Sequence, residues 1–297
     1  MLTLGAPNRS MNSFGSYAIF RVISDCYKGC MEQFLSLASR SIKSSEFDPG
    51  VYLIGAGPGA SDLITVRGAR ILAQADIVFY DALIDISMLG WCSGTKLVPV
   101  GKRCGSHSSS QHFINKQLVD AASKYPLVVR LKGGDPLIFG RAQEEIRALE
   151  NANVHYEIVP GITTALAASA QLKQPPTTRE LSRTLTLTTL PSRCAHEDHQ
   201  TFIYYMARDE LSAVASTLMK QGCSANTPVC LMESVSLLTQ RSFACTLSEL
   251  CLGDIHHHFS DRHPVVVMVG EVYRKKLKTL TPFIELAIHL NTFQAVS

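Results

Sequence analysis

The chain has 297 residues, 46% of them hydrophobic and 18% charged, so it is long enough for two domains and can bury a full core. Its net charge is only +3, which counts against binding nucleic acid through bulk positive charge. No apolar run approaches the ~20 residues that a membrane helix requires, so we expect neither nucleic acid nor membrane as a partner.

Nine cysteines are scattered along the chain, and no two are spaced as C-x-x-C. Their odd number and their spacing favour a reducing compartment with free thiols. The run His256-His257-His258 has side chains that bind metals, but no second group of ligands accompanies it. We therefore predict a solvated loop there and no metal.

Residues 1–50 differ from the rest because they are rich in serine and lack clear strand signals. We interpret them as a poorly ordered N-terminal extension. Arginines and lysines among many serines would suit an organelle transit peptide, whereas the acidic residues of the segment argue against one. We expect a cytoplasmic location, with an organelle as the alternative.

Residues 51–161 alternate strands with helices, a pattern typical of an α/β domain with a mainly parallel sheet. Short apolar runs predict strands at residues 51–54, 77–80, 96–100, 127–131 and 155–159. We expect a first helix that is capped by Ser61 or Asp62 and ends at about Ala73. Further helices are expected at residues 111–122 and from about Phe139 to Glu150.

Residues 162–275 are predicted to form a second, C-terminal α/β domain with a mixed sheet. Small side chains at residues 163–170 indicate a tightly packed helix, and Asp209 is expected to cap a helix at residues 209–220. Strands are expected at residues 182–189, 201–206, 228–232, 241–246 and 264–269. Residues 276–297 form a C-terminal tail, in which the apolar residues from Phe283 to Leu290 suit an amphipathic helix.

The stretch from Val128 to Arg141 combines a strand, a glycine turn and the start of a helix. Its apolar strand stops at Lys132-Gly133-Gly134-Asp135-Pro136, where two glycines leave no Cβ, so that a ligand can lie against the backbone. Asp135 adds an acceptor beside them. Because open α/β sheets bind ligands at the carboxyl ends of their strands, we predict a site for an acidic small molecule here, the alternative being an ordinary tight turn.

A second glycine loop, Gly55-x-Gly57-x-x-Ala60, follows the first strand of the domain. Together with Asp81 at the end of the next strand, it matches the fingerprint of dinucleotide-binding proteins and would suit an NAD-dependent dehydrogenase. Pro58 opposes this interpretation because it removes an N–H from the loop that would hold a pyrophosphate. Two glycine loops fit a ligand that lies across several strand ends better.

Eight motifs occur in the order that one protein family shows: Val51 to Pro58, Tyr80-Asp81-x-Leu83, Val100-Gly-Lys-Arg103, Arg130 to Pro136, Phe139-Gly-Arg141, Val159-Pro-Gly-Ile-Thr163, Tyr205-Met206 and Val269-Gly-Glu-Val272. On these motifs the chain resembles the tetrapyrrole methylase family over about residues 51–273. Within the family it is most similar to the members that form precorrin-2.

The resemblance implies two α/β domains with the active site in the cleft between them, usually in a homodimer. It implies S-adenosyl-L-methionine as methyl donor, S-adenosyl-L-homocysteine as product and no metal. The implied activity is C-methylation of uroporphyrinogen III, an acidic tetrapyrrole, to precorrin-2 in sirohaem or corrinoid biosynthesis.

The resemblance also assigns site residues. Asp81 matches the position of a proton acceptor and Lys102 that of a proton donor, although Asp81 could instead cap a turn. The cofactor-binding positions are Pro58, Gly133, Gly134, Asp135, Ile138, Thr163, Thr164, Met206 and Ala207. For Met206 alone, a place in the core is the better-supported alternative.

Eight substrate carboxylates call for a basic cleft, and bidentate arginines suit carboxylates best. The substrate-binding candidates are Arg103, Arg130, Arg141 and Arg179, with Lys102, Lys132 and Arg183 as further cations. A charge such as Arg130 at the end of an apolar strand is costly without a partner, so we expect it to have one.

The chain departs from the family pattern at several glycines and loop residues. Differences occur at Ala60, at Ala142 and Gln143, at Pro176 and Thr178, at Thr189 and Leu190, at Ala207 and at Ser234 to Ser236. Replacing a glycine that a ligand approaches closely can crowd the ligand. The alternatives are therefore another methylase of the family, acting on a later corrin precursor or on protein or rRNA, and a weakened homologue that only binds tetrapyrrole.

Overall fold

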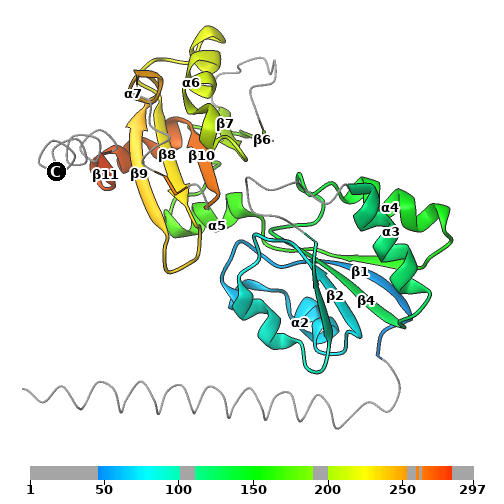
Figure 1. Ribbon diagram of the computed structural model, residues 1–297. Helices are drawn as coiled ribbons and strands as arrows, with labels where there is room; N and C mark the ends of the chain where they lie inside the picture. Colours follow the sequence, from blue (N-terminus) through cyan, green and yellow to red (C-terminus); the bar gives the residue numbers. More distant parts are fainter. Residues whose placement is uncertain (1–45, 101–110, 190–199, 253–258, 261–262, 283–297) are drawn as a thin grey trace, which may run out of the picture. The chain divides into compact units, whose positions relative to one another are not determined.

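The computed structural model describes residues 46–100, 111–189, 200–252, 259–260 and 263–282 (Figure 1). The expectations for residues 1–45, for the run at 256–258 and for a helix at 283–290 lie outside these ranges. Residues 49–297 form one compact unit, which holds two sheets. No helix within the described ranges has the length and apolar character needed to cross a bilayer.

The first sheet has five strands, and every neighbouring pair is parallel. Its strands are β1 (Gly50–Gly55), β2 (Ile77–Tyr80), β3 (Lys96–Pro99), β4 (Leu127–Lys132) and β5 (Tyr156–Val159), in the order β3-β2-β4-β1-β5. All six residues of β1 and all six of β4 are buried, as expected for inner strands covered on both faces. The predicted parallel sheet is confirmed.

Helices cover both faces of this sheet (Figure 1). On one face, Gly68 of α2 (Val66–Leu72) lies against Ile54. On the other face, α3 (Gln111–Ala122) and α4 (Ala142–Asn151) bury an apolar stripe against Val51, Leu53 and their neighbours in β2 and β4. Short 3-10 turns, η1 (Ser61–Leu63) and η2 (Ile86–Trp91), complete this domain.

The second sheet has six strands and is mixed, as predicted. Its strands are β6 (Thr184–Thr188), β7 (Gln200–Tyr204), β8 (Pro228–Glu233), β9 (Arg241–Thr246), β10 (Val265–Val269) and β11 (Thr281–Pro282), in the order β11-β9-β8-β10-β7-β6. The pairs β6·β7 and β9·β11 are parallel, and the other three are antiparallel. The expected fold class, two α/β domains, is thereby confirmed.

Helices again cover both faces of the second sheet. The small residues of α5 (Thr164–Gln171) pack with η5 (Glu271–Lys278) on the face that carries Ile203 and Met268. On the other face, α6 (Leu211–Lys220), which follows η3 (Arg208–Glu210), and α7 (Leu247–Leu252) cover Phe202 and its neighbours. The predicted domain limits at residues 50, 161 and 275 stay predictions.

Three local predictions are wrong. Thr65, and not Ser61 or Asp62, caps α2, because its side chain accepts a hydrogen bond from the N–H of Gly68. The third helix begins at Ala142 instead of Phe139, since Phe139 and Arg141 have left-handed φ angles of 51° and 55°. Asp209 lies inside η3, and the residue at the N-cap position of α6 is Glu210.

Candidate functional site

The strand order of the first sheet brings its carboxyl-end loops together. Strand β4 lies between β1 and β2, and β5 lies beside β1. The loop that follows β4 is therefore flanked by Asp81 after β2 and by residues 56–60 after β1. Reversal of strand order at this point creates the edge where α/β sheets bind ligands.

The two glycine loops are joined by a pair of backbone hydrogen bonds. The N–H of Gly134 donates to the carbonyl of Gly57 at 2.7 Å, and the N–H of Gly57 donates to the carbonyl of Gly134 at 3.2 Å. Both residues have positive φ angles, 80° at Gly57 and 67° at Gly134, which glycine adopts without strain. The loops after β1 and β4 are therefore one interlocked unit.

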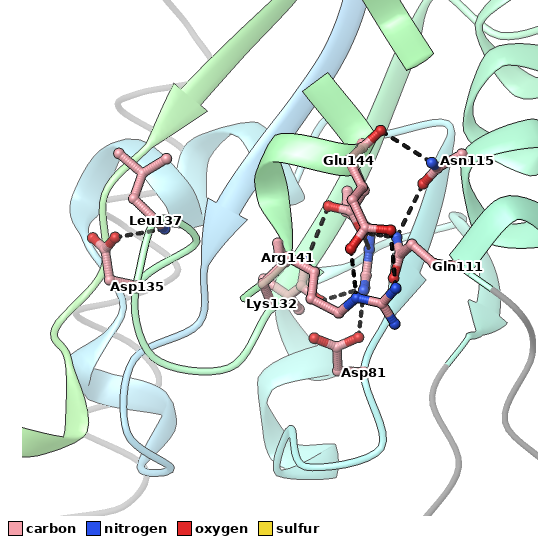
Figure 2. Close-up of polar contacts among 11 residues, drawn as sticks. Asp81, Gln111, Asn115, Lys132, Asp135, Leu137, Arg141 and Glu144 are labelled. Carbon is pink, nitrogen blue, oxygen red and sulfur yellow. Dashed lines mark hydrogen bonds and ion pairs between the residues drawn. The ribbon is translucent and has the colours of Figure 1, made fainter. Parts of the chain in front are cut away.

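A third loop, after β5, packs against this unit without room for side chains. A Cβ placed at Gly161 would lie 2.2 Å from the carbonyl oxygen of Gly134 and 2.7 Å from the Cα of Gly55. The carboxylate of Asp135 ties the loops further, because it accepts a hydrogen bond from the N–H of Gly161 at 2.9 Å. It accepts a second one from the N–H of Leu137, also at 2.9 Å (Figure 2). Three strand ends thus form a rigid floor.

Gly133 faces outwards from this floor. A Cβ at Gly133 would meet no atom within 4 Å, and the residue is exposed. The space over Gly133 is the kind of opening in which a ligand can lie against backbone. The N–H of Gly134 is not available for that purpose, since Gly57 already accepts its hydrogen bond.

The loop after β1 cannot hold a pyrophosphate as a dinucleotide-binding loop does. The N–H of Ala56 donates to Lys132, that of Gly57 to Gly134 and that of Ala60 to the hydroxyl of Ser236 at 3.0 Å. Pro58 has no N–H. With these donors used inside the protein, the geometry does not support a dehydrogenase.

The side chains of Asp81, Arg130, Glu145 and Lys132 are linked by ion pairs, and Figure 2 labels Asp81 and Lys132. Arg130 is 3% exposed and donates from Nε to Glu145 at 2.9 Å, from Nη2 to Asp81 at 2.5 Å and from Nη1 to the carbonyl of Leu131 at 3.1 Å. Lys132 donates from Nζ to the other oxygen of Glu145 at 3.0 Å. The partner expected for Arg130 is present, and the four formal charges balance.

The pKa values of the two cations reflect this environment. Burial, and then the nearby charge of Arg130, lower the pKa of Lys132, while Glu145 and Asp81 act in the opposite direction. Burial also opposes the charge of Arg130, but the carboxylates of Asp81 and Glu145 outweigh it and raise the pKa of Arg130. Asp81 and Glu145 therefore each accept a hydrogen bond from an Arg130 guanidinium that stays positively charged.

Asp81 is the member of this ion-paired group that reaches solvent. Its side chain is 30% exposed, against 3% for Arg130 and 0% for Glu145. Its Oδ1 accepts the bond from Arg130, and within the described ranges Oδ2 accepts none. Asp81 thus presents one carboxylate oxygen without a hydrogen-bond partner among the described residues.

Tyr205, after β7, connects the second sheet to these loops. Its hydroxyl lies 2.5 Å from that of Thr163 and accepts a hydrogen bond from the N–H of Ala165 at 3.3 Å, and its ring centroid lies 5.2 Å from that of Phe139. Burial raises the pKa of Tyr205, so the phenol stays protonated at neutral pH. Met206 beside it is 67% exposed with φ 53°, so it is not a core residue.

Other predicted residues are placed as follows. Pro58, Ile138 and Thr164 are half-buried in the loops just described, and Ala207 is fully buried. Arg141 is exposed and pairs with Glu144 at 2.7 Å (Figure 2). Lys102 and Arg103 lie outside the described residues.

Arg179 lines a hollow with a volume of about 450 Å³. The other residues of its lining are Thr177, Thr178, Ser182 and Arg183. Nε of Arg183 donates to the carbonyl of Arg179 at 3.1 Å. Within the described ranges, no hydrogen bond or ion pair joins Arg179 to the loops of the first sheet.

The replaced glycines do not face the loops. Ala142, Ala207 and Val235 are 4%, 0% and 3% exposed, and each packs in a hydrophobic core. Gln143 is exposed on α4. The crowding expected from these replacements is therefore not seen at the floor of the site.

Glu145 and Tyr205 received no role from the sequence. Glu145 is nevertheless the fully buried partner of two cations. The available signal was its position in the stripe Ala142, Glu145, Ile146 and Leu149, where one charge interrupts an apolar face. In the described part of the chain, no three His, Cys, Asp or Glu side chains gather as metal ligands do.

Known proteins match most of the chain. The family described as Tetrapyrrole (Corrin/Porphyrin) Methylases matches residues 50–251. A uroporphyrinogen-III C-methyltransferase from Cyanidium caldarium is 37% identical over 234 residues, which are 75% of this chain and 92% of that relative. A siroheme synthase from Pseudomonas fluorescens (strain SBW25) is 39% identical over 245 residues, which are 78% of this chain and 52% of the relative. The chain thus spans about half the length of that curated relative.

A solved structure shows the same fold. The uroporphyrin-III C-methyl transferase from Thermus thermophilus, complexed with S-adenyl homocysteine, superposes with a TM-score of 0.65 at 31% identity. The match covers 76% of this chain and 99% of that one.

Proposed function

The chain belongs to the tetrapyrrole (corrin/porphyrin) methylase family, and from this premise we propose that it methylates carbon atoms of uroporphyrinogen III with S-adenosyl-L-methionine, forming precorrin-2. The product would serve sirohaem or corrinoid biosynthesis. The observation that carries the proposal is the floor of three interlocked loops, which leaves Gly133 open beside an ionisable Asp81.

The loops fit the methyl donor. We assign its binding to Pro58, Gly133, Gly134, Asp135, Ile138, Thr163, Thr164 and Met206. Ala207, the ninth candidate, is fully buried in a hydrophobic core, so we do not assign it to the cofactor. The open space at Gly133 would admit a folded adenosyl group against backbone, and the exposed Met206 would supply an adaptable apolar wall. Because these residues come from both domains, we place the active site in the cleft between them.

The donor supplies an electrophilic methyl group on a sulfonium sulfur. In each transfer, a pyrrole carbon forms a C–C bond to that methyl, the S–CH₃ bond breaks and S-adenosyl-L-homocysteine leaves. Holding the two reacting atoms in line accounts for most of the acceleration, which can reach ~7–11 kcal/mol in favourable cases. The loops therefore act mainly by positioning.

The methylated ring must then lose a proton. We assign Asp81 as the acceptor, since among the described residues Oδ2 accepts no hydrogen bond while Oδ1 is fixed by Arg130. General-base help of this kind is worth ~10²–10⁴-fold. Lys102 is assigned as the proton donor from the family resemblance.

The carboxylates of the substrate require cations that can reach them. We assign this role to Arg103, Arg141 and Arg179, and the hollow between Arg179 and Arg183 supports Arg179. Arg130, the fourth candidate, is buried with each of its three nitrogens already donating to the protein, so an internal role suits it better. The homodimer, the metal-free chemistry and the cytoplasmic location expected above are retained as proposals.

The test uses the purified full chain with S-adenosyl-L-methionine and enzymatically made uroporphyrinogen III. The expected result is a product heavier by two methyl groups that fluoresces red after oxidation, and none without the donor. Tetrapyrrole binding without turnover would replace the proposal with a binding homologue. Methylation of a later corrin precursor alone would favour another family activity, and binding of NAD in place of S-adenosyl-L-homocysteine would restore the dehydrogenase interpretation.

A further inference from the structure

Glu145 occupies an unusual position for a carboxylate. It lies on the core-facing side of α4 with 0% exposure, among Ala142, Ile146 and Leu149. Its two oxygens each bind one cation, Oε1 binding Nε of Arg130 and Oε2 binding Nζ of Lys132. The amide of Gln111 adds a hydrogen bond to Oε1 at 3.3 Å.

Stability alone does not explain this arrangement. Removing charged groups from water is costly, and buried ion pairs are often no more stabilising than well-packed apolar residues of similar size. A role in fixing the orientation of neighbouring side chains explains such a buried network better than stability does.

The guanidinium of Arg130 connects Glu145 to Asp81 as a rigid plane. Nε is held by Glu145, Nη1 by the carbonyl of Leu131 and Nη2 donates to Oδ1 of Asp81. A planar group fixed at two of its nitrogens cannot rotate, so the third points in one direction. Asp81 is thereby held through Oδ1, while its side chain stays 30% exposed.

The second contact of Glu145 reaches the cofactor loop. Lys132 is the last residue of β4 and immediately precedes Gly133, and its carbonyl accepts the N–H of Ala56 at 2.7 Å. The carboxylate of Glu145 therefore contacts both Arg130, which binds Asp81, and Lys132, the residue before Gly133.

We propose that Glu145 is a positioning residue, which acts through Arg130 to hold Asp81 in the orientation that removes the proton. The proposal rests on the proposed function, because it takes Asp81 as the base. It gives Arg130 an internal role and gives α4 a part in catalysis without any contact with substrate.

The first experiment compares Glu145→Gln with Glu150→Gln, a matched change at an exposed carboxylate of the same helix. We expect Glu145→Gln to lower kcat on the order of 10²-fold, the effect of a small misplacement of a catalytic group. KM for uroporphyrinogen III and the affinity for S-adenosyl-L-homocysteine should stay within about twofold, since neither Glu145 nor Arg130 touches a ligand and backbone hydrogen bonds still hold the strand end at Lys132. Glu150→Gln should match the wild type. Unchanged kcat in Glu145→Gln would overturn the proposal.

The second experiment asks whether Glu145 acts through Asp81. In the Asp81→Asn background, Glu145→Gln should lower kcat by less than about twofold, because groups that act as one unit are not additive. A full additional loss would show that Glu145 acts elsewhere. Normal turnover of Asp81→Asn alone would instead reject Asp81 as the base, and absence of wild-type turnover would reject the proposed function, so the three failures differ.

Two further measurements keep the proposal testable if activity or folding is lost. The double variant Lys132→Met/Glu145→Gln removes one charge of each sign, so it should fold where Glu145→Gln does not, and it should show the same loss of kcat. A crystal structure of either variant should show the Asp81–Arg130 ion pair displaced. An unmoved pair would overturn the proposal whatever the activity.

Discussion

The loops of the two sheets place left-handed residues at different kinds of contact. Where the loops after β1 and β4 pair with each other, the left-handed residues are the glycines Gly57 and Gly134. In the loops after β7 and β8 they are Met206, Ser234 and Ser236, with φ angles of 53°, 52° and 69°. A left-handed non-glycine residue costs roughly 1–2 kcal/mol, so the second set must be held by its surroundings.

A buried carboxylate holds the loop after β8. Glu233 is 1% exposed, and it accepts hydrogen bonds from Nε of Arg241 at 2.6 Å and from the N–H of Ser260 at 2.7 Å. The hydroxyl of Ser236 then accepts the N–H of Ala60, which belongs to the first domain. The left-handed glycines Gly57 and Gly134 lie where two backbones hydrogen-bond to each other. The left-handed Ser236 lies where a side chain makes the contact, through its hydroxyl.

We place the chemistry at the loops of the first sheet, so we expect the largest effect on turnover from a change at the proposed general base, Asp81. Asp81→Asn keeps the shape of the side chain but removes its ability to accept a proton as a carboxylate. We expect turnover to fall ~10²–10⁴-fold with affinity for S-adenosyl-L-homocysteine nearly unchanged. Steady-state rates and calorimetric titration measure the two quantities, and an equal loss of both would remove Asp81 from the chemistry.

Gly161 tests whether the three loops form one unit. Gly161→Ala would place a methyl group 2.2 Å from the carbonyl oxygen of Gly134, so we expect the free energy of unfolding to fall by ~1–3 kcal/mol. Because the loops would separate, binding of S-adenosyl-L-homocysteine should weaken as well. Denaturant unfolding and calorimetry provide the measurements, and a variant as stable as the wild type would show that the loops are not interlocked.

Gly133 lies in the same turn but should behave differently. A methyl group there meets no protein atom, so Gly133→Ala should unfold like the wild type. It should nevertheless weaken S-adenosyl-L-homocysteine binding by about tenfold or more, the usual cost of one misplaced methyl group in a pocket. Unchanged affinity would place the cofactor away from Gly133.

Ser234 tests the strained loops with the smallest expected effect. Its hydroxyl is buried without a hydrogen-bond partner in the described structure, and its φ is left-handed. Ser234→Gly relieves both costs and loses only backbone entropy, so we expect a stabilisation of about 1 kcal/mol. Ser234→Ala, which keeps the strain, should gain less. Destabilisation by the glycine would mean that this conformation carries no strain.

The sequence predicted the strands and the nature of each sheet, because apolar runs such as Val128 to Leu131 and the alternation of elements are local signals. It also predicted that Arg130 would have a partner. It did not identify Glu145, since a residue 15 positions along the chain becomes that partner only when α4 packs on the sheet.

The remaining errors have local causes. The start of α4 was placed too early because left-handed Phe139 and Arg141 leave no periodic signal, and Thr65 replaced the expected caps because η1 intervenes. The sequence shows that glycines are replaced but not which way the new side chains point, so it suggested crowding at the site. In the fold, Ala142 and Val235 face hydrophobic cores.

A crystal structure of the full chain with S-adenosyl-L-homocysteine tests the central claim most directly. The account predicts that the ligand contacts Gly133 to Asp135 and Thr163 on one side and Met206 on the other, with its sulfur facing the side of the loops that carries Asp81. Density for the ligand elsewhere, with Gly133 left in contact with solvent alone, would contradict it.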